Sequence, residues 1–221
     1  MRAFTVIDAE QRSPEWYAAR LGRLTGSVAG DMLAKRKDKT EAAGRRNLRL
    51  RLILERLTWK SQASSFQSEA MKAGIEREPL AIAAYEAHTG LLFEQTGFLS
   101  HNTLMLGASL DAHLGAFEVL VSIKCREAAA HWDFLRIGSI PADAIAQMRH
   151  EAFMCQDTFR EHHYVSWNPD FPEGKQLKVA VYTPPMLDIP EYEGEALAFL
   201  AEVDRELASI DGWKAAAAGI A

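Results

Sequence analysis

The stretch GASLDAHLGAFEVLVSIKC, residues 107–125, combines β-prone apolar runs with an aspartate and a lysine. Side chains alternate between the two faces of a β-strand, so Ser122 and Lys124 are expected on one face and Ile123 on the other. Asp111 ends the preceding apolar run, and adjacent antiparallel strands bring such ends close together. The stretch therefore predicts that Asp111 and Lys124 share a site at the end of two neighbouring strands.

The composition is typical of one globular domain. A chain of 221 residues with 48% hydrophobic residues is long enough for a sizeable core. We expect a single domain over residues 1–221, with a core at about 13–185 and an acidic C-terminal helix at about 190–210. No run approaches the ~18 apolar residues of a membrane span, and the first residues lack the apolar region of a secretory signal. These features predict a cytoplasmic protein that does not bind membranes.

Charge is distributed unevenly along the chain. Residues 20–60 hold twelve Lys and Arg against four acidic residues, whereas residues 161–221 hold four basic residues against eleven acidic ones. This split fits a protein with one face toward a polyanion, and it also fits two ordinary solvated surfaces. Four arginines of the basic segment are candidates to line a duplex channel or to solvate their helix: Arg45, Arg46, Arg49 and Arg51.

Local patterns predict helices, then strands, then a mixture. Ser13 and Pro14 are typical of a helix start, and Gly90 is typical of a helix end. Pro79 suggests that the helical region 68–88 is two helices with a junction near Gly74. Further helices are expected at 28–33, 41–59, 142–159 and 192–210, and strands at 91–99, 104–110, 117–125, 164–167 and 177–182. The order indicates an α/β fold in which helices cover a mixed sheet.

Four blocks, in order along the chain, resemble the motifs of one nuclease family. WYAAR (16–20) with TGS (25–27) resembles the opening pattern W...R....TAS, and GIERE (74–78) with YE (85–86) and TG (89–90) is similar to a helical pattern G...E......YE..TG. GASLD (107–111) resembles G.SPDG, and SIKC (122–125) resembles E-hydrophobic-K-C. In addition to these four blocks, AQM (146–148) is similar to a helical glutamine motif. By these motifs the chain resembles the lambda exonuclease or YqaJ-type alkaline exonuclease family of the PD-(D/E)XK nuclease superfamily, over about residues 13–165.

The resemblance implies a restriction-endonuclease-like fold, with a mixed central β-sheet flanked by helices, and a metal-dependent active site. Asp111 and Glu78 would bind Mg²⁺, with Mn²⁺ as an alternative and the carbonyl of Ile123 as a further ligand. Lys124 would orient or deprotonate the attacking water and offset charge on the scissile phosphate. Gln147 would hold water or substrate.

The resemblance also implies a substrate and partners. Arg20, Ser27 and Ser109 match the positions that form a pocket for a 5′ phosphate in the family. The implied activity is digestion of one strand of double-stranded DNA from a 5′ phosphorylated end, in phage-type recombination, by a ring-shaped homotrimer. The 3′ overhang produced would pass to a single-strand annealing protein.

One departure from the family pattern affects the chemistry. Leu110 and Ala112 replace turn residues, whereas Ser122 replaces a glutamate that would bind the metal. The change predicts impaired activity and has three explanations: an engineered change that traps substrate, a natural inactive member, or replacement by Glu118. The last is least favoured because four residues of strand span about 13 Å. A DNA-end-binding protein without chemistry, and an interaction domain whose basic helix meets an acidic partner, stay open as alternatives.

Overall fold

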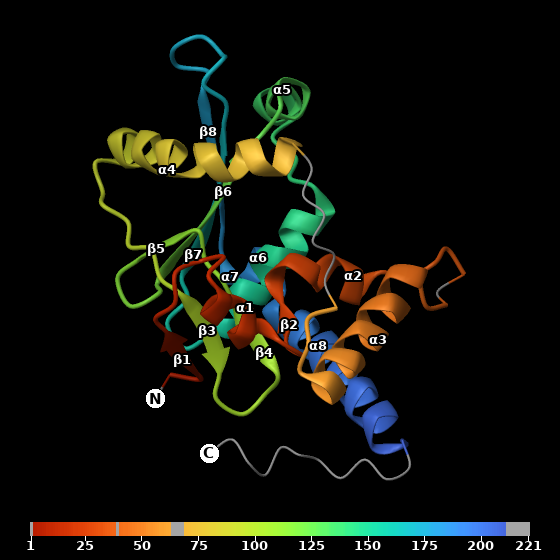
Figure 1. Cartoon of the computed structure of the whole chain (residues 1–221). Coiled ribbons are helices and arrows are strands. Elements are labelled where there is room, and N and C mark those ends of the chain that lie inside the picture. Colours follow the sequence, from red (N-terminus) through yellow and green to blue (C-terminus); the bar gives the residue numbers. More distant parts are fainter. Residues whose placement is uncertain (1, 39, 63–68, 211–221) are drawn as a thin grey trace.

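The computed structural model describes residues 2–38, 40–62 and 69–210, and within them the strands form two four-stranded mixed sheets (Figure 1). In the first sheet β2 runs parallel to β4, and in the second β6 runs parallel to β7; the other neighbours are antiparallel. The first sheet has the order β1 (Phe4–Ile7), β3 (Phe98–His101), β4 (Leu106–Ala108) and β2 (Leu24–Thr25). The second has the order β5 (Ala112–Leu114), β6 (Val119–Cys125), β7 (Glu161–Trp167) and β8 (Leu177–Tyr182).

Helices cover these sheets, and the first of them begins as the sequence predicts. The Ser13 side chain accepts a hydrogen bond from the backbone N–H of Trp16, and Pro14 occupies the first turn of the helix. The helical elements are α1 (Pro14–Arg20), the 3₁₀-helix η1 (Gly26–Val28), α2 (Ala29–Leu33), α3 (Ala43–Thr58), α4 (Glu69–Thr89), α5 (Ala128–Ile137), α6 (Ala142–Met154), α7 (Pro184–Leu187) and α8 (Ile189–Ala208).

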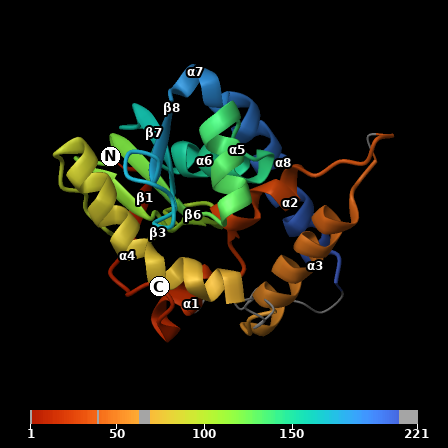
Figure 2. The same ribbon diagram turned by 90° about the horizontal axis from the view of Figure 1, so that it is seen from above.

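Strand β6 lies between two helical layers. Val121 and Ile123 belong to a cluster with Tyr85 of α4, whereas Leu120 belongs to the main core with Met148 of α6. Figures 1 and 2 show α4 and α6 on opposite sides of β6. Helices cover both faces of β6, and this explains why residues 119–123 are mostly apolar and do not alternate between apolar and polar.

The acidic helix α8 is part of the main core. Tyr192 and Phe199 are fully buried, and they share that core with Leu52 of α3 and Met148 of α6. Figure 1 shows α8 running beside α3, and the two helices are in contact. The predicted α/β arrangement of a mixed sheet flanked by helices is confirmed, with the strands divided between two sheets.

Some predicted boundaries are wrong, and the physical reasons are local. The region 69–89 is one helix that contains Pro79, because burial of Ala81 and Tyr85 against the sheet holds it together despite the backbone hydrogen bond that proline cannot donate. Gly90, with φ of 71°, ends this helix as predicted. The strand expected at 91–99 is limited to β3, since Leu91 and Leu92 are exposed.

Six of the elements that the structure describes were not anticipated: β1, β2, η1, β5, α5 and α7. Three of them are strands of two to four residues, which is too short for a clear alternation of apolar and polar positions. Within the described ranges, no helix is both long enough and apolar enough to span a membrane.

Candidate active site

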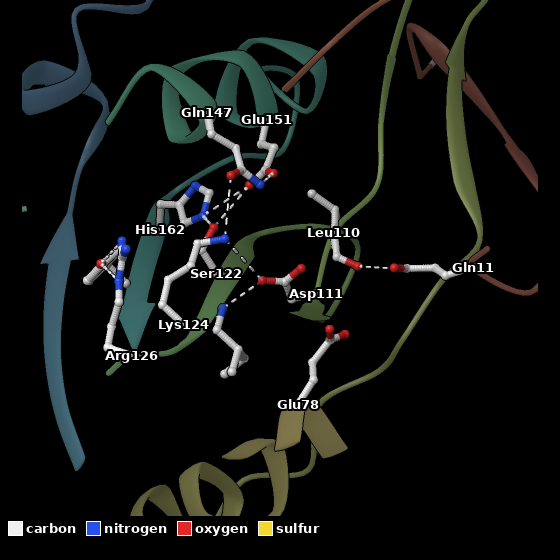
Figure 3. A network of polar contacts seen from close by, with 12 residues as sticks. Gln11, Glu78, Leu110, Asp111, Ser122, Lys124, Arg126, Gln147, Glu151 and His162 are labelled. Atoms are coloured by element: carbon white, nitrogen blue, oxygen red, sulfur yellow. Dashed lines mark hydrogen bonds and ion pairs between the residues drawn. The ribbon is translucent and has the colours of Figure 1, made fainter. Parts of the chain in front are cut away.

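Asp111 and Lys124 lie side by side at the edge of β6 (Figure 3). Asp111 Oδ2 accepts a hydrogen bond of 2.7 Å from the backbone N–H of Ile123 and lies 3.8 Å from Lys124 Nζ. In an extended strand the N–H and C=O of one residue point to the same edge, so the Ile123 carbonyl also faces the Asp111 side. The structure thus brings together the three groups that the sequence placed at one site.

Glu78 enters the same pocket from α4. Its Oε2 lies 3.0 Å from Arg12 Nη2, and burial together with the charge of Asp111 raises the pKa of Glu78. The carboxylates of Glu78 and Asp111 repel each other in this half-buried site. A cation that binds oxygen ligands, such as Mg²⁺, would relieve that repulsion. In the part of the chain that the structure describes, no group of three His, Cys, Asp or Glu side chains converges as a metal site. Mg²⁺ needs only one or two protein carboxylates, because water and phosphate oxygens complete its shell.

Helix α6 points two side chains at the face of β6 that carries Ser122 and Lys124. Lys124 Nζ donates to Gln147 Oε1 at 3.5 Å, and Gln147 Nε2 donates to Glu151 Oε1 at 2.8 Å. Glu151 Oε2 in turn accepts from Ser122 Oγ at 3.4 Å. The sequence pointed to Gln147 but not to Glu151. The signal available for it was its position four residues after Gln147, which places both on one helix face.

Glu151 is a buried acid beside a buried histidine. Its residue is 2% exposed, and burial followed by the charge of Asp111 raises the pKa of its carboxyl group to about 8. His162 Nε2 lies 3.3 Å from Glu151 Oε2 and 3.0 Å from Ser122 Oγ, and burial lowers the pKa of His162 to about 3. Both shifts favour the uncharged forms, a protonated acid and a neutral imidazole.

Arg20 organises a second cluster of polar side chains. Its guanidinium donates to Ser109 Oγ at 3.0 Å, to Ser27 Oγ at 3.2 Å and to Thr25 Oγ1 at 3.4 Å, and it stacks 4.1 Å from the Trp16 ring centre. The three residues expected at a 5′ phosphate therefore meet around one cation. Ser27 lies in η1, ahead of the short helix α2.

Burial and the nearby charge of Arg51 lower the pKa of Arg20 to about 10, so the group is still charged at neutral pH. Two arginines held close together in a half-buried place favour an anion between them. The Arg20 cluster is therefore suited to bind a phosphate group.

A single pocket joins the Arg20 cluster to the Asp111 site. Its volume is about 540 Å³, and its walls include Arg20, Ser27, Glu78, Asp111 and Lys124. Volumes of this size accommodate small-molecule ligands such as a nucleotide. A phosphate held by Arg20 would therefore lie in the same cavity as the acidic residues.

Of the arginines predicted to bind DNA on α3, Arg45 and Arg49 form ion pairs with α8, whereas Arg46 is exposed. Arg45 pairs with Glu202 of α8 at 2.7 Å, and Arg49 pairs with Glu206 at 2.7 Å. These contacts neutralise part of the basic and acidic segments within the fold. Arg46 is exposed, and the role of all three in DNA binding stays a prediction.

Comparisons with known proteins agree with this geometry. Residues 15–156 match the model of the YqaJ-like viral recombinase domain. The alkaline exonuclease LHK-Exo from Laribacter hongkongensis is 32% identical, over 89% of this chain and 95% of that one, with a TM-score of 0.77. Its complex with dAMP gives 33% identity, the same coverage and a TM-score of 0.76. A phage-related exonuclease from Haemophilus somnus 129PT, at 13% identity over 84% and 96% of the two chains and a TM-score of 0.62, shares the fold. No curated protein matches the chain.

Proposed function

The chain belongs to the family of YqaJ-like viral recombinase domains and is a nuclease of the recombination type, and we propose that it digests one strand of duplex DNA from a 5′ phosphorylated end with Mg²⁺. The observation that carries this proposal is the pocket shared by Arg20 and Asp111. A terminal phosphate held at one end of the pocket presents the neighbouring phosphodiester to the carboxylates at the other end. An end-bound phosphate thereby selects exonuclease over endonuclease action.

The residues of the pocket have separate roles in this proposal. Arg20 binds the terminal phosphate by paired hydrogen bonds, and Ser27 and Ser109 hold the guanidinium and add hydroxyl donors. Lys124 donates to the attacking water or to the scissile phosphate, and Gln147 fixes the position of its ammonium group.

Asp111 and Glu78 would hold Mg²⁺, together with the Ile123 carbonyl. The bound ion would polarise the scissile phosphate and lower the pKa of the attacking water. The backbone N–H of Ile123 fixes the orientation of the Asp111 carboxylate before any ligand arrives.

The finer features of the proposal follow from the family. The product is a duplex with a 3′ overhang, which a single-strand annealing protein then binds, and the active form is a ring-shaped homotrimer with DNA in its centre. A relative crystallised in complex with dAMP supports a nucleotide as product. The role belongs to phage-type homologous recombination.

The proposal is tested with a 5′ phosphorylated duplex, a matched 5′ hydroxyl duplex and Mg²⁺. We expect this chain to shorten only the strand that begins with the phosphate, and to leave the complementary strand intact. The Ser122→Glu variant, which restores the family residue on β6, is assayed beside it. Failure of both proteins to digest either duplex would overturn the nuclease assignment.

A second candidate is a DNA-end-binding protein without chemistry. Ser122 favours it, because the carboxylate that the family pattern has on β6 is absent. If no other carboxylate takes its place, reduced activity or simple end binding is expected. End binding that weakens with salt, without cleavage by this chain or by Ser122→Glu, would support this candidate.

A further inference from the structure

Position 122 on β6 lacks a carboxylate, and a carboxylate from another element reaches it. Ser122 Oγ donates to Glu151 Oε2 at 3.4 Å (Figure 3). We propose that Glu151 of α6 supplies the acidic group that β6 lacks, so that Asp111 and Glu151 bind the divalent ion together. The inference rests on the proposed function, and it predicts that the chain is active as it stands.

The position of Glu151 on α6 supports this assignment. Gln147 lies one helical turn earlier and contacts both Lys124 Nζ, at 3.5 Å, and Glu151 Oε1, at 2.8 Å. Residues four apart lie on one helix face, so α6 presents Gln147 and Glu151 to the same face of β6. The Glu151 carboxylate is therefore linked to Lys124 through a single side chain.

Within the described part of the chain, Glu151 is buried without a lysine or arginine partner. The residue is 2% exposed, and among the described residues no lysine or arginine lies within ion-pair distance of it. Its ion-pair contact is with His162, which is itself fully buried. A buried carboxylate without a matched cation is unfavourable, so the group stays protonated until a positive charge lies beside it. A divalent ion at this edge would provide the missing positive charge.

A second departure from the family pattern lies beside these side chains. The family has alanine in its TAS block where this chain has Gly26. A Cβ atom at Gly26 would lie 3.3 Å from Gln147 Cγ and 3.4 Å from Glu151 Oε1. Gly26 therefore lies directly beside the two α6 side chains, where a methyl group would make a tight contact with Gln147 and an ordinary contact with Glu151.

Glu118 is not in a position to do the same work. It precedes β6, its side chain is 42% exposed, and it pairs with Arg160 at 3.1 Å. Glu118→Gln is therefore a matched control, since it removes one glutamate charge close in sequence to β6 but outside the site.

The test compares the wild type with Glu151→Gln, with Ser122→Glu/Glu151→Gln and with Glu118→Gln. Mn²⁺ binding is measured by calorimetry without DNA, and digestion of a 5′ phosphorylated duplex is measured separately. We expect Glu151→Gln to weaken Mn²⁺ binding at least ~10-fold and to slow digestion at least ~100-fold. We expect the double variant, which moves the carboxylate back to β6, to regain both properties. Glu118→Gln should match the wild type.

Each outcome decides one of the two proposals. Wild-type Mn²⁺ binding and digestion by Glu151→Gln would overturn the role of Glu151 while leaving the nuclease assignment intact. Failure of the correctly folded double variant to regain Mn²⁺ binding would also overturn it. If Mn²⁺ binding follows the expected order but no protein digests DNA, the metal site stands and the proposed function fails.

Discussion

Lys124 forms an ion pair with Asp111, and its ammonium group is held by Asp111 and Gln147. We predict that Lys124→Met lowers the rate of digestion by about 10²–10⁴, the usual contribution of a proton-transfer group. Binding of DNA ends should change little, because several arginines line the same pocket. Single-turnover nucleotide release and fluorescence anisotropy measure the two effects. Lys175→Met, at an exposed loop position, serves as the control, and an equal loss there would contradict the role of Lys124.

Arg20 is predicted to determine the preference for a phosphorylated end. Its hydrogen bonds to Ser27 and Ser109 prepare the guanidinium for a phosphate. We expect Arg20→Ala to reduce the ratio of digestion rates on 5′ phosphate and 5′ hydroxyl duplexes to about one, since a charged hydrogen bond contributes roughly 1.5–3 kcal/mol. Arg136→Ala, which removes an exposed arginine on α5, should keep the wild-type ratio. If Arg20→Ala keeps the wild-type ratio of digestion rates on the two duplexes, Arg20 does not bind the 5′ phosphate.

His150 is predicted to make the fold sensitive to acid. It is fully buried between the Tyr192 hydroxyl group and the Gly107 carbonyl, and burial lowers its pKa to about 4. The unfolded chain binds this proton near pH 6.5, so between about pH 6.5 and 4 the unfolded state holds one more proton and acid favours unfolding. As the pH is lowered through this range, the titration of His150 should reduce the free energy of unfolding by about 1.4 kcal/mol for each pH unit.

Urea unfolding between pH 7.5 and 4.5 measures this effect. His150→Gln should show a smaller dependence of the unfolding free energy on pH, by about one proton. His88→Gln, which changes an exposed histidine of α4, should keep the wild-type dependence. An unchanged pH dependence in His150→Gln would rule out this origin of acid sensitivity.

Helix α8 stabilises the element that carries Gln147 and Glu151, because it packs against both α6 and α3. We predict that Phe199→Ala, at a fully buried position, lowers the free energy of unfolding by about 3–5 kcal/mol. Leu197→Ala on the same helix, where the side chain is 38% exposed, should cost less than about 1 kcal/mol. Denaturant unfolding measures both. Similar values for the two variants would show that α8 is not part of the core.

The helices and strands differ in how far they follow from local sequence. Helix α1 and strand β8 match the prediction because Ser13 is a strong cap and the run from 177 to 182 is bounded by polar residues. Helix α4 does not match the prediction. Pro79 predicts a break in the helix, but packing against β6 keeps the helix continuous. Short strands such as β2 exist only through pairing with distant segments, here Leu24 with Leu106, which no local pattern contains.

At the scale of the whole molecule, the pocket collects residues that are far apart in the chain. The motif match pointed to Arg20, Glu78, Asp111 and Lys124, and all four line one pocket. The sequence did not reveal Glu151, because a glutamate on an amphipathic helix is usually solvated and its burial is set by the packing of α6 on β6. Pairing of Arg45 with Glu202 was also hidden, because the partners lie 157 residues apart.

The most direct test of a nuclease centre at Asp111 and Lys124 is digestion of a 5′ phosphorylated duplex in Mg²⁺ by the wild type and by Asp111→Asn. The labelled strands are resolved by length over time. We predict that the wild type shortens the phosphorylated strand from its 5′ end and that Asp111→Asn leaves it at full length. Equal digestion by the two proteins would contradict the assignment of the centre, and so would a wild type that leaves the duplex intact.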